Sequence, residues 1–323
     1  MDFIDKSIAT VTNLCKRMER KAGNETASVI YVLICVFLFY SMMIFQKIYQ
    51  DQITPLQVLT WRGLVSTIMM YTIMKRMKID MHSNSRKITF QKDFRNIAGA
   101  FLNVMVFFTI SKLPLTTVNL IHAAGPFWVI LLDWIMVRTK YSKLELLIFL
   151  LSACGVFLVL VPDLQASFNE DQSTSKYVTG YARLLWILLL FMTLAVWAWS
   201  VVVIKKMTTI NILTLNFPFF IILTVLGAGG QLAVGKLVQP DFGFFVMSSL
   251  YLGAVTFICQ HTYVRALQIG RPAKINMFAN LYPVFGFLFE VFYYHEYPTL
   301  IKVIGASITI GCSLKVALQK LKE

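Results

Sequence analysis

Polar side chains inside long apolar stretches are the residues of this chain whose chemistry needs explaining. Two stretches, 115–137 and 272–294, each place four such residues or prolines on one helical face, within about 60° and about 80° respectively at a 3.6-residue period. They are Asn119, His122, Pro126 and Asp133 on the first, and Asn276, Asn280, Pro283 and Glu290 on the second. Unpaired amides or imidazoles in hydrocarbon are costly, so both faces should point into a bundle interior or a water-filled cavity. This predicts hydrogen-bonded recognition of a solute; asparagines that only fasten helix to helix are the alternative.

Arg62 is the one basic residue that lies within an apolar span rather than near a span end. It lies roughly 10 Å into the membrane at 1.5 Å per residue, where arginine costs up to about 3 kcal/mol. Its planar guanidinium suits a carboxylate or phosphate, which predicts an anion anchor; a structural arginine that snorkels outward or binds helix-end carbonyls is the alternative. The predicted substrate-binding set is Arg62, Asn103, Asn119, His122, Gln260, His261, Asn276 and Asn280.

Asp133 and Glu290 lie within about a turn of predicted helix ends, where water can reach them. We interpret them as structural or gating acids rather than as a proton relay. Pro126 and Pro283 lie inside predicted spans and should loosen or kink them, so they join the gating or structural set.

No motif predicts an enzyme, a metal site or a cofactor. The sequence has no H-x-x-x-H spacing, no G-x-x-x-x-G-K loop and no nucleophile flanked by a base. Its five cysteines include four within apolar stretches and no C-x-x-C pair, so neither a disulfide framework nor a zinc site is expected.

The composition predicts an all-α integral membrane protein. The 323 residues are 57% hydrophobic and 14% charged, with a mean hydropathy of +0.67, which leaves too few polar residues to cover water-soluble domains. Ten apolar stretches are long enough to span a bilayer. They are 28–48, 55–74, 94–111, 115–137, 143–161, 183–204, 210–233, 242–267, 272–294 and 298–316.

The net charge of +14 orients these spans. With the N-terminus inside, 23 of the 30 Lys and Arg residues fall on the cytoplasmic side and six on the outer side, so both termini are predicted to be cytoplasmic. The basic residues form short groups between apolar runs, which argues against nucleic acid and for the lipid bilayer as partner. Residues 1–27 read as a cytoplasmic amphipathic segment, either an interfacial helix or a tail.

A tandem duplication is visible in the sequence. Asn119, Pro126, Asp133 and Ser142 match Asn276, Pro283, Glu290 and Thr299 at one offset of 157 residues. Five spans separate the copies, and an odd number inverts the second copy, as in secondary carriers. The predicted organisation is a first repeat over 28–161, a linker loop over 162–182, a second repeat over 183–316 and a tail over 317–323.

The two copies resemble EamA domains of the drug/metabolite transporter superfamily, to which the solute carrier 35 proteins belong. The resemblance rests on the stretch from Leu113 through Gly125-Pro126 to Gly155, and on the stretch from Ala266 through Tyr282-Pro283 to Gly311. Where the family often has an acid, the second copy has Glu296 and the first has Thr139. The resemblance implies a ten-helix bundle with a central pocket, and with the fifth and tenth helices at the periphery.

The sequence therefore predicts a secondary transporter that moves a small organic metabolite by alternating access, with an organic anion or zwitterion favoured. A nucleotide-sugar or sugar-phosphate exchanger is the alternative within the superfamily. A transport-inactive membrane scaffold, acting through the N-terminal segment and the basic stretch 75–93, is the alternative of another class. The sequence leaves open a homodimer and the choice between plasma membrane and endomembrane.

Overall fold

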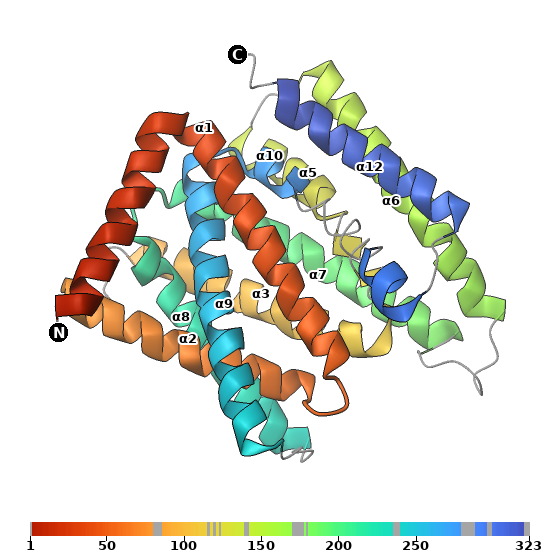
Figure 1. The fold of residues 1–323 in the computed structure, drawn as a ribbon. Coiled ribbons are helices and arrows are strands. Elements are labelled where there is room, and N and C mark those ends of the chain that lie inside the picture. The colour runs from red at the N-terminus through yellow and green to blue at the C-terminus, as the bar shows by residue number, and fades with distance from the viewer. Residues whose placement is uncertain are drawn as a thin grey trace.

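The computed structural model describes residues 2–79, 86–114, 117–118, 121–122, 124–138, 142–169, 178, 180–234, 240–278, 288–295 and 299–319. Every regular element in these ranges is a helix (Figure 1). In chain order they are α1 (Asp2–Ile48), α2 (Pro55–Met77), α3 (Arg86–Lys112), α5 (Gly125–Val137), α6 (Lys143–Asn169), α7 (Gly180–Lys206), α8 (Ile212–Val234), α9 (Phe242–Ile269), α10 (Pro272–Met277), η2 (Glu290–Tyr294) and α12 (Leu300–Gln319).

Local sequence signals set several helix ends. Pro55 and Pro272 stand in the first turns of α2 and α10. Proline is tolerated there because a backbone N–H in the first turn has no acceptor within the helix. Thr54 and Gln57 form a reciprocal capping box before α2. Within α1, Gly23 has φ 76° and ψ 157°, a combination that is easy only for glycine, and the helix bends sharply there.

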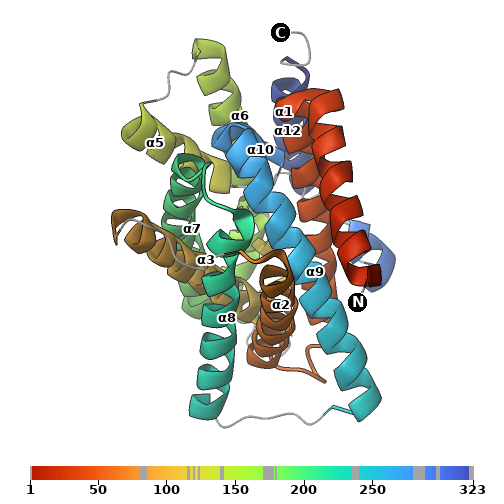
Figure 2. The same ribbon diagram turned by 90° about the vertical axis from the view of Figure 1, so that its left-hand side faces the viewer.

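Most helices pack into one core, and one pair stands beside it. Helix α1 runs along α9, α3 along α7, and α2 packs against both α8 and α9; Figure 2 shows α2 nearly end-on between these two. Helix α5 contacts α7 and α10. Helices α6 and α12 pack mainly on each other at one edge of the molecule (Figure 1).

The outward faces of the helices are apolar, which identifies the protein as an integral membrane protein. Large side chains such as Phe37, Leu150, Phe157, Leu188 and Met247 are exposed on α1, α6, α7 and α9. Apolar exposure spread over so many helices calls for lipid rather than water as the surrounding medium. Within the described residues, five helices are long and apolar enough to cross a membrane, and two shorter helices are also apolar.

Several helices extend beyond the predicted apolar stretches. Helix α3 begins at Arg86 rather than near residue 94, and α6 continues to Asn169, into the predicted linker. The stretch 115–137 is interrupted, because Ala124 lies in a turn and α5 begins at Gly125. Apolar runs report only the part of a helix that lies in hydrocarbon, so they miss helical turns outside it. Of the stretch 272–294, the structure describes 272–278 and 288–294.

Candidate solute-binding site

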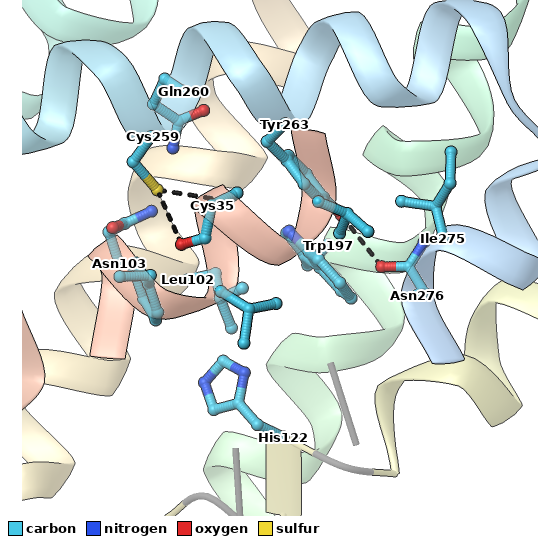
Figure 3. Close-up of a pocket in the computed structure, with 13 residues that line it drawn as sticks. Cys35, Leu102, Asn103, His122, Trp197, Cys259, Gln260, Tyr263, Ile275 and Asn276 are labelled. Atoms are coloured by element: carbon cyan, nitrogen blue, oxygen red, sulfur yellow. Dashed lines mark hydrogen bonds between the residues drawn. The ribbon is translucent and has the colours of Figure 1, made fainter. Parts of the chain in front are cut away.

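A cavity of about 70 Å³ lies between α1, α3, α7, α9 and α10 (Figure 3). Apolar and aromatic side chains form most of its wall, and a few polar groups project into it, as is common for ligand sites. Its lining residues are Val32, Cys35, Val36, Phe39, Leu102, Asn103, His122, Trp197, Cys259, Gln260, Tyr263, Ile275 and Asn276. Four of the predicted residues therefore line one cavity: Asn103, His122, Gln260 and Asn276. His122 lies at the lower side of the cavity in the view of Figure 3.

Asn276 and Tyr263 give the cavity an ordered polar end. The hydroxyl of Tyr263 donates to Oδ1 of Asn276 at 2.9 Å, and Nδ2 of Asn276 donates to the carbonyl of Pro272 at 2.7 Å. The ring of Tyr263 lies nearly parallel to that of Trp197, with 6.3 Å between the ring centroids. These contacts tie α9, α10 and α7 together around the cavity.

Arg62 does not line the cavity but lies fully buried behind its wall. Its Nη2 donates to Oδ1 of Asn103 at 3.0 Å, and its Nε donates to Oγ1 of Thr256 at 3.0 Å. The guanidinium also covers the ring of Phe107, 4.6 Å from the ring centroid. Among the described residues no carboxylate lies within ion-pair distance of Arg62, and its Nη1 has no hydrogen-bond partner. The described residues thus hold the buried charge with neutral groups and leave both N–H groups of Nη1 unused.

Arg95, at the start of the predicted span 94–111, is a second buried arginine. It is 4% exposed, and its Nη1 donates to Oδ1 of Asn96 and of Asn216 at 2.6 and 3.3 Å. Asn216 in turn donates to the carbonyl of the cavity residue Gln260 at 3.3 Å. Helix α3 packs against α8 and so buries this position, which the apolar pattern placed at a span end. The consecutive polar pair Arg95-Asn96 at the edge of an apolar run was the available signal.

The structure keeps other predicted residues away from the cavity. His261 follows Gln260 but its ring faces Phe257 instead. Nδ1 of His261 is hydrogen-bonded to the carbonyl oxygen of Phe257 at 3.3 Å, and the two ring centroids are 4.5 Å apart. Pro126 stands in the first turn of α5 rather than inside a continuous helix. Asp133 was expected to be reached by water, yet it is buried at 4% exposure, near enough to Lys205 for their charges to interact.

Three predicted residues, Asn119, Asn280 and Pro283, lie outside the described residues, and of Glu290 only the backbone is described. Conversely, Cys35, Cys259 and Tyr263 line the cavity without having been predicted. The period of α9 was a usable signal, because Cys259 and Tyr263 are within one helical turn of Gln260.

Comparison with known proteins assigns the fold to a family. Residues 26–161 and 184–316 each match the EamA-like transporter family, and together they make up most of the chain. The chain belongs to the EamA-like transporter family. The cavity of this EamA-like protein therefore lies between its two family segments, with α1 and α3 from the first and α7, α9 and α10 from the second.

Its relatives include two curated proteins named solute carrier family 35 member G1. The human protein is 22% identical over 312 residues, covering 95% of this chain and 84% of its own length. The mouse protein is 21% identical over 315 residues, covering 94% and 83%. A solved crystal structure that is 11% identical has the same fold, with a TM-score of 0.70 over 92% of this chain and 99% of the other. The EamA-like chain is thus a member of a family of membrane transporters rather than of enzymes.

Proposed function

We propose that this protein is a secondary transporter that moves a small organic solute by alternating access through the cavity between its two family segments. The observation that carries the proposal is the composition of the cavity wall, to which both segments contribute polar groups: Asn103 from one, and Gln260, Tyr263 and Asn276 from the other. At about 70 Å³ the cavity is far below the roughly 300–1,000 Å³ of ligand sites. Solute binding therefore requires the helices around it to move apart.

The ten-span inverted repeat is part of this proposal and is supported by the packing of the helices. If the spans containing α1, α2, α3, α5 and α6 correspond in order to those containing α7, α8, α9, α10 and α12, exchange of the two copies turns the most extensive helix contacts into other observed ones. The α1–α9 contact becomes α7–α3, and α2–α9 becomes α8–α3, while α2–α8, α5–α10 and α6–α12 map onto themselves. Residues 157 apart even meet directly, since Oγ1 of Thr309 donates to the carbonyl of Ser152 at 3.5 Å.

We further propose that both termini are cytoplasmic and that residues 1–27 and 317–323 lie outside the repeats. A tag at either terminus should be cleaved by protease only from the cytoplasmic side. Access from opposite sides for the two tags would show an odd number of spans and would remove the inverted repeat.

The favoured substrate is a small organic anion or zwitterion with one carboxylate. Arg62 supplies a buried positive charge next to the wall residue Asn103, and its Nη1 donor is unused by the described residues. A sugar-phosphate or nucleotide-sugar exchanger is the second candidate, because Arg95 adds a buried guanidinium near Gln260 and Tyr263. A solute with one carboxylate needs one buried guanidinium, whereas a phosphorylated solute needs both.

Counterflow in proteoliposomes tests the proposal. Purified protein should exchange at least one radiolabelled solute from a panel of amino acids, monocarboxylates, sugar phosphates and nucleotide sugars. Exchange should be faster for the solutes that carry one carboxylate and no phosphate. Exchange of phosphorylated solutes alone would favour the second candidate. Folded protein that exchanged nothing from the panel would favour the scaffold alternative. Where exchange is found, deletion of residues 78–85 or of residues 2–22 should leave the flux intact, because a carrier does not act through these segments.

A further inference from the structure

Two thiols face each other across the cavity wall. Sγ of Cys35 on α1 and Sγ of Cys259 on α9 lie 3.2 Å apart, and Sγ of Cys259 also lies 3.6 Å from the carbonyl of Cys35 (Figure 3). Both cysteines are buried from the outside, at 5% and 2% exposure, and both line the cavity. Cys154 is exposed on α6 and Cys312 is partly exposed on α12, so these two have a different environment.

The distance between the thiols suits a disulfide better than a metal site. A disulfide joins its sulfur atoms at about 2.05 Å, so a closure of roughly 1 Å brings this pair to bonding distance. Rotation of the two side chains can supply much of such a shift. Among the described residues, no group of three or more Cys, His, Asp or Glu side chains is placed to hold a metal ion.

We propose that Cys35 and Cys259 form a redox-sensitive pair, and that their oxidation to a disulfide locks α1 to α9 and stops transport. Hydrogen peroxide is a sufficient oxidant. The thiolate of one cysteine attacks a peroxide oxygen, which gives a sulfenic acid and, after protonation of the leaving hydroxide, one water. The second thiol attacks the sulfenic sulfur, the S–S bond forms, and the hydroxyl leaves with the second thiol proton as another water. Two thiols thus lose two electrons and two protons, and the peroxide becomes two waters.

The consequence for transport follows from the helices that the bond would join. Helix α1 belongs to the first family segment and α9 to the second, so the disulfide is a covalent link between the two halves at the cavity. This part rests on the proposed function: halves that rock about the cavity cannot change their separation while they are linked at its wall. A thiol reductant restores the free thiols and with them the motion.

The link can be detected without any transport assay. The test chain keeps Cys35 and Cys259, carries Ser at Cys15, Cys154 and Cys312, and has a protease site inserted between the two family segments, within residues 170–177. After treatment with hydrogen peroxide and cleavage in membranes, the two fragments should migrate together on a gel without reductant and separate with reductant. The single variants Cys35→Ser and Cys259→Ser are matched controls and should separate in both conditions. Fragments of the two-cysteine chain that separate after oxidation would overturn the thiol pair.

Flux measured on the same samples tests the lock. In the two-cysteine chain, the rate of solute exchange should fall in proportion to the fraction of cross-linked protein and recover with reductant. Each single variant should keep its own untreated rate after peroxide. Full exchange by fully cross-linked protein would overturn the lock while leaving the disulfide established. Reduced protein that exchanges no solute contradicts the proposed function instead, and the gel result is independent of it.

Discussion

Nη2 of Arg62 donates a hydrogen bond to Oδ1 of Asn103 at 3.0 Å, so a cation behind the cavity wall is directly bonded to an amide that forms the wall. The amide of Asn103 is held on its other side as well, where Nδ2 donates to the carbonyl of Gly99 at 2.8 Å. Its orientation is therefore fixed from both ends. The unused Nη1 donor gives the arginine capacity to bind a further oxygen when the helices move.

Two replacements of Arg62 should show separately how its positive charge and its forked hydrogen bonding contribute to solute exchange. Arg62→Gln removes the positive charge and is expected to reduce solute exchange strongly with little loss of folded yield, because glutamine can still donate to Asn103. Arg62→Lys keeps the charge but cannot bind Asn103 and Thr256 as a fork, so an intermediate rate is expected. Initial exchange rates in proteoliposomes, normalised to monodisperse protein, give the comparison. Arg138→Gln, at an exposed site, is the control, and equal rates for it and Arg62→Gln would remove Arg62 from the site.

The hydroxyl of Tyr263 should matter for solute affinity. Tyr263→Phe leaves Oδ1 of Asn276 without its 2.9 Å donor, so the amide of a cavity residue becomes free to reorient. The expected result is a higher KM for exchange at similar maximal rate. Tyr251→Phe removes an equivalent hydroxyl that bonds Ser41 on the outer face of the bundle, 2.8 Å away, and should change neither parameter. The same KM for both variants would contradict a role for this end of the cavity.

Close packing of α2 on α8 depends on a glycine. A Cβ added at Gly227 would lie 2.6 Å from both the backbone N and Oγ1 of Thr60, so Gly227→Ala must push the helices apart. Overpacking of this kind typically costs about 1–3 kcal/mol. Thermal unfolding in detergent should show a lower midpoint for this variant. Gly229→Ala, two residues along the same helix, meets nothing within 4 Å and should unfold like the parent.

An ion pair holds the N-terminal part of α1, before the bend at Gly23, against α9. Nε and Nη2 of Arg265 donate to the two carboxylate oxygens of Glu19 at 2.8 and 2.6 Å, and the hydroxyl of Tyr31 donates to Oε1 at 3.2 Å. Glu19→Arg should therefore speed trypsin cleavage after Lys16 and Arg17, two sites that the parent also has. The double variant Glu19→Arg with Arg265→Glu restores opposite charges and should slow cleavage again. Equal cleavage of the single and double variants would show that this segment is held by other contacts.

The sequence predicted cavity residues well where a polar residue stands within an apolar run. It predicted burial poorly where the packing of another helix determines what surrounds a residue. Asn103 and Gln260 stand out as amides within hydrophobic stretches, and both line the cavity. Arg95 escaped notice because counting basic residues near span ends cannot show that α8 covers one of them. His261 was grouped with Gln260 by adjacency, although one residue along a helix is a rotation of about 100° to another face.

The position of Arg62 shows the same limit. The apolar run placed it in the membrane, and it is indeed buried, but hydropathy cannot show that Asn103 and Thr256 hold the guanidinium behind the wall. The break at Ala124 also lacks a local signal beyond the following Gly125-Pro126, since proline is compatible with either a kinked helix or a new helix start.

Access to the cavity from each side of the membrane is the most direct test of the central claim. Gln260→Cys in a chain otherwise free of cysteine places one thiol at the cavity, and a membrane-impermeant thiol reagent is added to sealed vesicles of either orientation. The account predicts labelling from both sides, slowed from both by a transported solute. Labelling from one side only, unaffected by every solute that the protein exchanges, would contradict it.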